Sequence, residues 1–262
     1  LPQRSTTDGP GSSTTARPAD RIDGMCGRYT LHTEKQALAE RFDFDPGDLA
    51  TLAPRYNVAP TQNVVVVRGG AERRVASFMR WGLVPAWAKT RAGLPQLINA
   101  RSEGIASKPA FRAPLRRQRC LIPADGFYEW QAPMPPGKRK IPHWIGLASS
   151  EVFAMAGLWS VWQPKDGEVA EPLHSCVILT AAANEAVHAI HERMPVILPR
   201  DAESAWLDPA LDGNVEAITA LLTPVAASAL RAHPVSTRVN SVRNDDPSLL
   251  ELATDDPQLG FL

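Results

Sequence analysis

Cysteine is scarce in this chain. Its three cysteines, Cys26, Cys120 and Cys176, are odd in number, lie far apart and form no C-x-x-C pair. This pattern argues against a framework of disulfides and against a structural zinc site. It is typical of a reducing compartment, and we expect a cytoplasmic protein, associated with the nucleoid if it is bacterial.

Two further patterns are absent. No apolar run approaches the roughly 18 residues that a membrane span requires, so we predict no membrane partner. The zinc-binding pattern H-E-x-x-H is missing, and the pair His188 and His191 has no evident third ligand. We therefore predict neither a bound metal ion nor any other cofactor.

The charges balance overall but are unevenly distributed. Residues 1–140 carry 22 lysines and arginines against 12 acidic residues, whereas residues 141–262 carry 6 against 16. The basic residues are densest at 101–140. This asymmetry indicates one basic face, which suits phosphate groups if other features point to nucleic acid; a solvated surface is the alternative.

Large apolar side chains are nearly absent from residues 1–24, which are rich in Ser, Thr, Pro and Gly. Such a segment cannot bury a core, so we expect a disordered leader, and it lacks the apolar stretch of a secretory signal. One domain is expected over 25–246, followed by a tail at 247–262 that carries no motif.

Strand patterns dominate the rest of the chain, without the regular alternation of strands and helices that marks parallel α/β folds. We predict an α+β fold, a single domain with a mixed, mostly antiparallel sheet curled into a pseudo-barrel and short peripheral helices. Strands are expected within 63–70, 73–85, 119–130, 143–148, 152–162, 175–180, 195–198 and 230–242, and helices at 34–42, 183–194, 202–207 and 214–222.

Six short motifs with polar residues lie beside these apolar strands. In chain order they are MCGRYT (25–30), RYNVAPTQ (55–62), RWGLVP (80–85), NARSE (99–103), DGFYEW (125–130) and HERMP (191–195). Together they resemble the SRAP family, the SOS response-associated peptidases, over residues 25 to about 245. One such motif would be weak evidence, but six in the family's order leave little room for coincidence.

The resemblance implies a mixed α/β structure built on curled sheets. It also implies a protein that shields abasic sites in single-stranded DNA by a covalent crosslink through an N-terminal cysteine. The implied partner is therefore single-stranded DNA that contains abasic sites, and we expect a monomer. Peptidase activity on its own N-terminus and lyase-like activity at the abasic site are further activities that the family suggests.

Cys26 is the residue that this crosslink requires. An abasic site exists partly as an open-chain aldehyde, and an α-amine with a pKa of about 7.7–8 is neutral often enough to form a Schiff base with it. The neighbouring thiol can then close a five-membered thiazolidine ring, which needs both nucleophiles on one residue. The alternative for Cys26 is a small buried hydrophobe.

Glu129 and His191 are the candidates for proton transfer. Glu129 stands between two aromatic residues in FYEW, where a carboxyl can have a raised pKa; an exposed residue of an edge strand is the alternative. By resemblance it is the catalytic acid and base that assists opening of the sugar ring and reversal of the crosslink. His191 is expected at the end of a helix, where it would serve the Schiff-base step.

The NARSE motif supplies two further site residues. By resemblance, Asn99 holds the cysteine α-amine and the sugar, while Arg101 contacts phosphate, and Arg28 is expected to contact phosphate too. The planar guanidinium suits phosphate geometry. A surface ion pair is the alternative for each arginine.

Four more residues are predicted to bind DNA. Trp81 can stack on a base or wedge beside the lesion, with a core tryptophan as the alternative. Asn57 and Pro60 resemble the family's pocket wall, and Thr180, which follows an apolar strand, is expected to line the same pocket.

Two other functions stay open. The first is a thiol peptidase in which Cys26 is the nucleophile and His191 the base, with the protein's own N-terminus as its most credible substrate. The second is a protein that binds modified bases non-covalently, for which the cysteine chemistry would have no purpose.

The leader bears directly on this chemistry, because a residue that precedes Cys26 converts its amine into an amide that cannot form the ring. Three explanations remain open. Translation starts at Met25, which we expect because Leu1 is no normal start; or the protein cleaves itself before Cys26; or this chain is inert towards abasic DNA.

Overall fold

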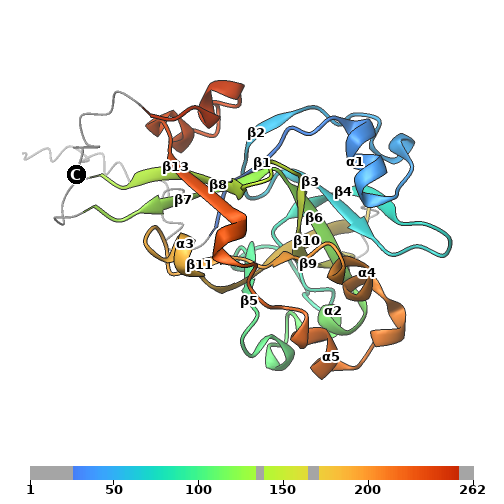
Figure 1. Cartoon of the computed structure of the whole chain (residues 1–262). Coiled ribbons are helices and arrows are strands. Elements are labelled where there is room, and N and C mark those ends of the chain that lie inside the picture. The colour runs from blue at the N-terminus through green and yellow to red at the C-terminus, as the bar shows by residue number, and fades with distance from the viewer. Residues whose placement is uncertain (1–25, 134–138, 165–170, 254–262) are drawn as a thin grey trace, which may run out of the picture.

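Strands make up most of the ordered elements in the computed structural model, which describes residues 26–133, 139–164 and 171–253 (Figure 1). The predicted α+β class is confirmed, because the helices are short and no regular strand–helix alternation occurs. The disorder expected for residues 1–24 lies outside the described residues. None of the described helices is long and apolar enough to cross a membrane.

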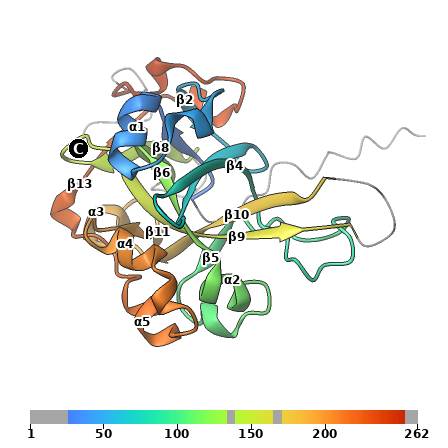
Figure 2. The same cartoon turned by 90° about the vertical axis from the view of Figure 1, so that its right-hand side faces the viewer.

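Five strands close into a barrel in the hydrogen-bonded order β10-β4-β3-β6-β9, and the ring closes because β9 also pairs with β10. The pairing of β4 with β10 is parallel, and the others are antiparallel. β9 and β10 continue side by side beyond the body of the molecule (Figure 2). The strands are β3 (Asn63–Arg68), β4 (Val75–Trp81), β6 (Arg119–Ala124), β9 (Phe153–Trp162) and β10 (Leu173–Ala182).

Three short strands extend this sheet. β5 (Asn99–Arg101) runs parallel to β10, β11 (Arg193–Pro195) pairs with the end of β10, and β12 (Ile197–Leu198) pairs with β9. Because β5 and β11 both join β10 near Thr180, the NARSE and HERMP motifs meet at one end of that strand.

A second sheet has five strands in the order β13-β8-β7-β1-β2. The chain crosses from the barrel to this sheet at Asp125, between β6 and β7. The Asp125 carboxylate accepts from the backbone N–H groups of His32, at 2.5 Å, and Thr33, at 3.0 Å, which fixes β1 beside β7. The strands are β1 (Tyr29–Leu31), β2 (Arg55–Val58), β7 (Gly126–Gln131), β8 (Ile141–Leu147) and β13 (Leu230–Pro234).

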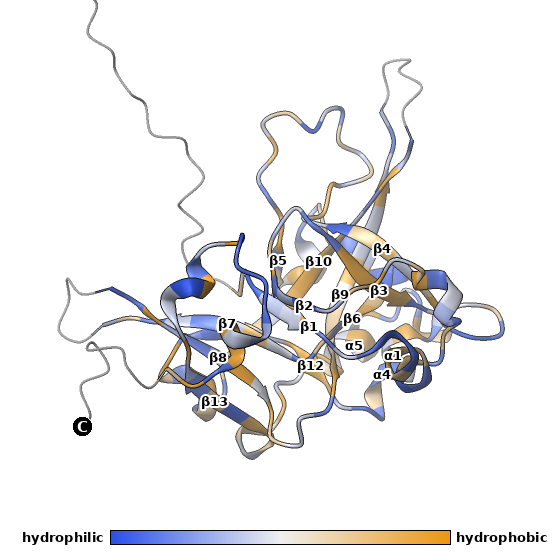
Figure 3. Ribbon diagram, turned by 90° about the horizontal axis from the view of Figure 1, so that it is seen from above, coloured by the Kyte–Doolittle hydropathy of each residue, from blue (hydrophilic) through white to orange (hydrophobic). Residues whose placement is uncertain are grey.

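Residues of two hydrophobic clusters lie on the two sides of β7. Figure 3 shows β7 beside β8 in the second sheet. Phe127 belongs to the main core, whereas Tyr128 packs in a smaller cluster with Trp144 and Val239. Because side chains alternate along a strand, Glu129 lies on the face of Phe127 and points towards the main core. This register explains why a carboxylate is buried in the middle of an apolar sheet.

The helices lie outside the sheets, and α1 forms where the spacing of Leu38 and Phe42 predicts it, with both side chains buried. α4 covers β6, where the indole N–H of Trp206 donates to the Cys120 carbonyl oxygen at 2.9 Å. The helices are α1 (Lys35–Phe42), α2 (Arg112–Arg117), α3 (Glu185–His188), α4 (Ala202–Leu207) and α5 (Val215–Ala220).

Two predicted elements are too long. The helix expected over 183–194 ends at His188, because Arg193–Pro195 pair with β10 as strand β11. His191 therefore lies in a loop and does not end a helix. The strand expected over 230–242 stops at Pro234, because Thr237–Asn240 form a 3-10 helix shortly after it.

The described fold continues past the boundary expected at residue 246. A 3-10 helix, Pro247–Leu250, follows, and its Leu249 is completely buried against Tyr128 and Trp144. Residues 247–253 are therefore part of the domain, while 254–262 lie outside the described residues.

Candidate functional site

Three polar side chains come together beneath the start of β1. Cys26 lies three residues before the first residue of this strand, Asn99 opens β5, and Glu129 lies in the middle of β7; all three are buried. The Asn99 Nδ2 donates to the Cys26 carbonyl oxygen at 2.8 Å, and the Cys26 thiol lies 3.9 Å from the Arg28 carbonyl oxygen. The structure thus unites three of the four residues predicted to be catalytic.

Burial controls the protonation of this group. Only 3% of Glu129 is exposed, and burial raises the pKa of its carboxyl to about 8, despite the backbone N–H of Trp130 and the charge of Lys140, which favour ionisation. The pKa of the Cys26 thiol is raised by burial and, to a smaller extent, by the nearby Glu129. At neutral pH both groups therefore keep their protons.

Two polar atoms of the site have no hydrogen-bond partner among the described residues. They are Oε1 of Glu129 and Oδ1 of Asn99, and both are buried. Buried polar atoms in folded proteins nearly always have partners, so these two atoms distinguish the site from the rest of the buried core. Both belong to side chains that approach Cys26.

His143 is a neighbour of Glu129 that the sequence did not indicate. The β7–β8 register places these two residues directly opposite each other, and opposite residues of antiparallel strands share one face. Burial lowers the pKa of His143, and its Nδ1 lies 3.1 Å from the Ile141 carbonyl oxygen. A neutral imidazole therefore stands beside the protonated carboxyl.

His191 lies close to the end of β7 but outside the buried group. The Gln131 Nε2, at the end of β7, donates to the Ala189 carbonyl oxygen at 3.2 Å and so fixes the loop that carries His191. The Arg193 backbone N–H donates to His191 Nδ1 at 3.0 Å, and the same ring nitrogen lies 3.1 Å from the Arg193 carbonyl oxygen. Among the described residues, His191 makes no hydrogen bond with Cys26 or Glu129.

The Arg28 side chain is oriented by a hydrogen bond to Asn57. The Arg28 Nη1 donates to Asn57 Oδ1 and to the Val239 carbonyl oxygen, both at 2.9 Å. The Asn57 amide is fully buried and donates in turn to three backbone carbonyls, the shortest contact being 2.8 Å to Asn244. Asn57 therefore positions Arg28 and the 239–244 segment and has no group left for DNA.

Arg101 of β5 pairs with Thr180 of β10, whereas Pro60 follows β2. Arg101 is exposed, Pro60 is half-buried, and Thr180 is completely buried. The Thr180 carbonyl oxygen accepts from Arg193 at 2.7 Å, and Arg193 also forms a two-point ion pair with Glu103, at 2.7 and 2.8 Å. Arg193 and Glu103 therefore join the NARSE and HERMP motifs, a connection that no local pattern reveals.

Trp81 and Trp87 have opposite environments. Trp81 is completely buried, packs edge-on against Tyr29, and donates its indole N–H to the Ile98 carbonyl oxygen at 2.8 Å. It is the core tryptophan that the sequence left as an alternative, so it cannot stack on a base. Trp87, six residues later, is 58% exposed. The exposed tryptophan of this region is therefore Trp87, and the tryptophan predicted to be exposed, Trp81, is in the core.

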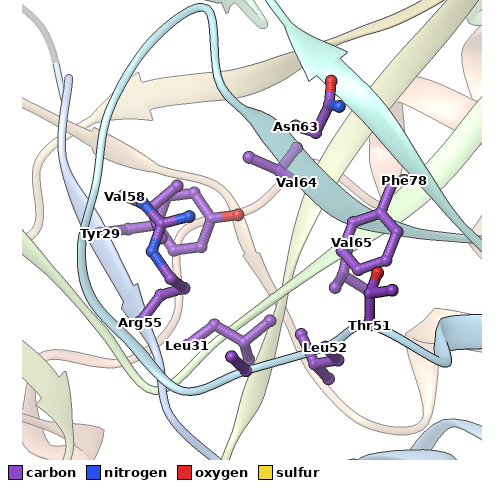
Figure 4. Close-up of a pocket in the computed structure, with 11 residues that line it drawn as sticks. Tyr29, Leu31, Thr51, Leu52, Arg55, Val58, Asn63, Val64, Val65 and Phe78 are labelled. Carbon is purple, nitrogen blue, oxygen red and sulfur yellow. The ribbon is translucent and has the colours of Figure 1, made fainter.

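A separate small pocket lies between β1, β2 and β3 (Figure 4). Its volume is about 140 Å³, its lining is mostly apolar, and the Tyr29 hydroxyl points into it. Arg55 at its edge is committed to Asp245, at 2.5 Å, and to Gln62, at 2.8 Å. Cys26, Asn99 and Glu129 do not line this pocket. Among the described residues, no cluster of three potential metal ligands exists.

The α+β fold therefore buries a cysteine thiol beside a protonated carboxyl. A comparison with known protein families identifies the family of this chain. The model of the SOS response associated peptidase (SRAP) family matches residues 25–242. The chain belongs to this family, as the six motifs predict.

Curated relatives carry names that describe a shared role. The chain is 43% identical over 229 residues to the abasic site processing protein YoqW of Bacillus subtilis, covering 87% of this chain and 99% of that protein. It is 36% identical over 228 residues to the abasic site processing protein HMCES of Gallus gallus, covering 75% and 66%. A crystal structure of a Bacteroides thetaiotaomicron protein matches with a TM-score of 0.77 and 26% identity, covering 87% of this chain and all of that one.

Proposed function

We propose that this protein senses abasic sites in single-stranded DNA and crosslinks to them through Cys26, once the residues before Cys26 have been removed. The observation that carries the proposal is the buried group of Cys26, Asn99 and Glu129, in which two polar atoms lack partners beside the thiol. The printed names of the relatives support the same substrate.

The proposed reaction joins one aldehyde carbon to two atoms of Cys26. The α-amine condenses with the open-chain sugar aldehyde, a C=N bond forms, and water leaves. The thiol sulfur then adds to the same carbon, the C=N electrons return to nitrogen, and a thiazolidine ring results. The only by-product is water, so no oxidant or metal enters the balance.

Glu129 supplies and recovers the proton in this scheme. With a pKa of about 8 it is protonated at neutral pH and can donate to the departing oxygen. The resulting carboxylate can accept the thiol proton when sulfur adds to carbon. The thiol, whose pKa is also raised, needs such a base at its side. Asn99 Oδ1 is free to accept from the amine or from a sugar hydroxyl.

The DNA strand is proposed to follow the exposed cations and the open tryptophan. Arg101 is exposed and Arg28 is oriented by Asn57, so both guanidinium groups can meet phosphates near the lesion. Trp87 offers a ring for base stacking. The protonation of Cys26 argues against a general cysteine peptidase, because a thiolate is disfavoured in this environment and His191 does not bond to the thiol.

The test is adduct formation with an oligonucleotide that carries one abasic site, followed on a denaturing gel. The full chain is compared with a chain whose translation starts at Met25, so that Cys26 becomes the first residue. Cys26→Ala should abolish the adduct. The matched controls, Cys120→Ala and Cys176→Ala, remove other buried thiols and should keep it. Equal crosslinking by Cys26→Ala would refute the proposal.

A further inference from the structure

The end of β4 and the loop between β4 and β5 line a second pocket. It has a volume of about 410 Å³ and is lined by Arg80, Arg91, Gln96 and otherwise uncharged residues of the same loop. The loop ends directly before Asn99, so this pocket adjoins the candidate site along the chain. In Figure 2 the loop lies beside β9 and β10.

The loop is fixed by packing. The Trp162 indole N–H donates to the Ala88 carbonyl oxygen at 2.8 Å, and Val84 packs with both residues in a small buried cluster. At its base, Leu83 and Leu97 form an isolated β-bridge. The pocket therefore exists before any ligand arrives.

The Arg80 guanidinium packs against Gly82. Gly82 has a φ of +125°, and a Cβ atom added there would lie 2.8 Å from Arg80 Nη1. The guanidinium occupies the space that a side chain at position 82 would take. The same Nη1 lies 3.4 Å from the Trp81 carbonyl oxygen, which orients the group towards the pocket.

The pocket carries uncompensated positive charge. No acidic residue lines it, and neither Arg80 nor Arg91 forms an ion pair with any other described residue. Both arginines line the same pocket, and the pKa of Arg80 is lowered by partial burial and, to a smaller extent, by the positive charge of Arg91. An anion between them would relieve that repulsion.

We propose that the Arg80–Arg91 pocket binds a backbone phosphate of the DNA strand that reaches the candidate site. Guanidinium forks match phosphate oxygens geometrically, and the loop that carries Arg91 leads directly into β5, the strand that begins at Asn99. The assignment rests on the proposed function for its ligand, but not on the crosslinking chemistry.

The test measures non-covalent binding of the full chain to an undamaged, fluorescent single-stranded oligonucleotide over a range of KCl concentrations. For single strands, each phosphate contact contributes about 0.7 to the slope of log affinity against log salt. Arg80→Gln and Arg91→Gln should each weaken binding by about 3- to 10-fold, the effect of losing one charged contact. In the double variant, the slope of log affinity against log salt should be smaller by about 0.7, because both guanidinium groups contact the same phosphate.

Arg200→Gln is the matched control, since Arg200 is exposed on the turn between β12 and α4. An unchanged slope in the double variant, or an equal change in the control, would overturn the proposal. Arg91 is exposed, so its variant tests the pocket even if Arg80→Gln does not fold.

Free phosphate is the competing source of the same chemistry. Calorimetric titration with inorganic phosphate separates the two: binding that is lost in the double variant, together with an unchanged DNA slope, would assign the pocket to free phosphate and refute the DNA contact. Because the oligonucleotide is undamaged, a failure here is distinct from a failure of adduct formation. If the double variant loses about 0.7 of slope as expected but the unmodified protein forms no adduct with abasic DNA, only the crosslinking proposal is contradicted.

Discussion

At the scale of single residues, Glu129 determines how the chemistry depends on pH. Its raised pKa of about 8 means that the carboxyl holds its proton below that pH and loses it above. The proposed acid step therefore slows as pH rises through about 8. The Cys26 amine has the opposite requirement, because it reacts only when neutral, with an ordinary pKa of about 7.7–8.

We expect the crosslinking rate of the wild-type protein, measured at saturating abasic DNA, to peak near these two values. Glu129→Gln should lower the rate by about 10²- to 10⁴-fold, the usual contribution of general acid–base catalysis, and should remove the decline at high pH. Glu151→Gln, a change at an exposed glutamate between β8 and β9, is the control. A decline that persists in Glu129→Gln would assign it to another group.

The sequence specified the identities of the reactive residues but not their surroundings. Cys26, Asn99 and Glu129 are predicted from short motifs, and the structure brings them together. His143 was missed because it faces Glu129 only through the register of β7 with β8, a pairing that local patterns do not encode.

At the scale of elements, β2 and the 239–244 segment are joined by one asparagine. The Asn57 side chain accepts from Arg28 and donates to three carbonyls, all in a buried setting. Asn57→Ala should lower the free energy of unfolding by about 2–4 kcal/mol, because it leaves buried partners unsatisfied. It should also weaken DNA binding, since Arg28 loses its orientation.

Urea unfolding and oligonucleotide binding measure these two effects. Asn63→Ala is the control, because Asn63 is exposed at the start of β3. If Asn57→Ala were as stable as Asn63→Ala, Asn57 would not be the residue that holds this segment.

Substitutions of the two tryptophans in the β4–β5 region are expected to have opposite effects on DNA binding and on stability. Trp87→Ala should weaken binding of single-stranded DNA by about 1–3 kcal/mol, the value of one stacked base, and leave stability nearly unchanged. Trp81→Ala should lower stability by about 3–5 kcal/mol, because it empties a core position. Thermal unfolding and fluorescence anisotropy of a labelled oligonucleotide separate these effects; a stability loss in Trp87→Ala equal to that in Trp81→Ala would contradict the assignment.

Local sequence patterns predict most of the helices and strands but place some of their ends wrongly. The helix at α1 and the strands β3, β4, β9 and β10 follow from apolar spacing, because each signal lies within one element. The helix expected over 183–194 is shorter because β11 pairs with β10, and Trp81 is buried because β4 pairs with β10 in the barrel. Burial depends on partners far along the chain.

At the scale of the whole molecule, the class of fold could be predicted but not its division into two sheets. β6 and β7 are consecutive in the chain, yet they belong to the barrel and to the second sheet. The crossing at Asp125 depends on hydrogen bonds to the His32 and Thr33 backbone, which no turn motif reveals. This crossing places Glu129 beneath Cys26, so the site is a product of the topology.

The most direct test of the central claim is the intact mass of the purified protein before and after incubation with an abasic-site oligonucleotide. We predict that the free protein has the mass of a chain whose first residue is Cys26. The adduct should be heavier by the mass of the oligonucleotide less one water. Protein that begins at Cys26 and yields no adduct would contradict the account, and so would an adduct on protein in which Cys26 is still preceded by other residues.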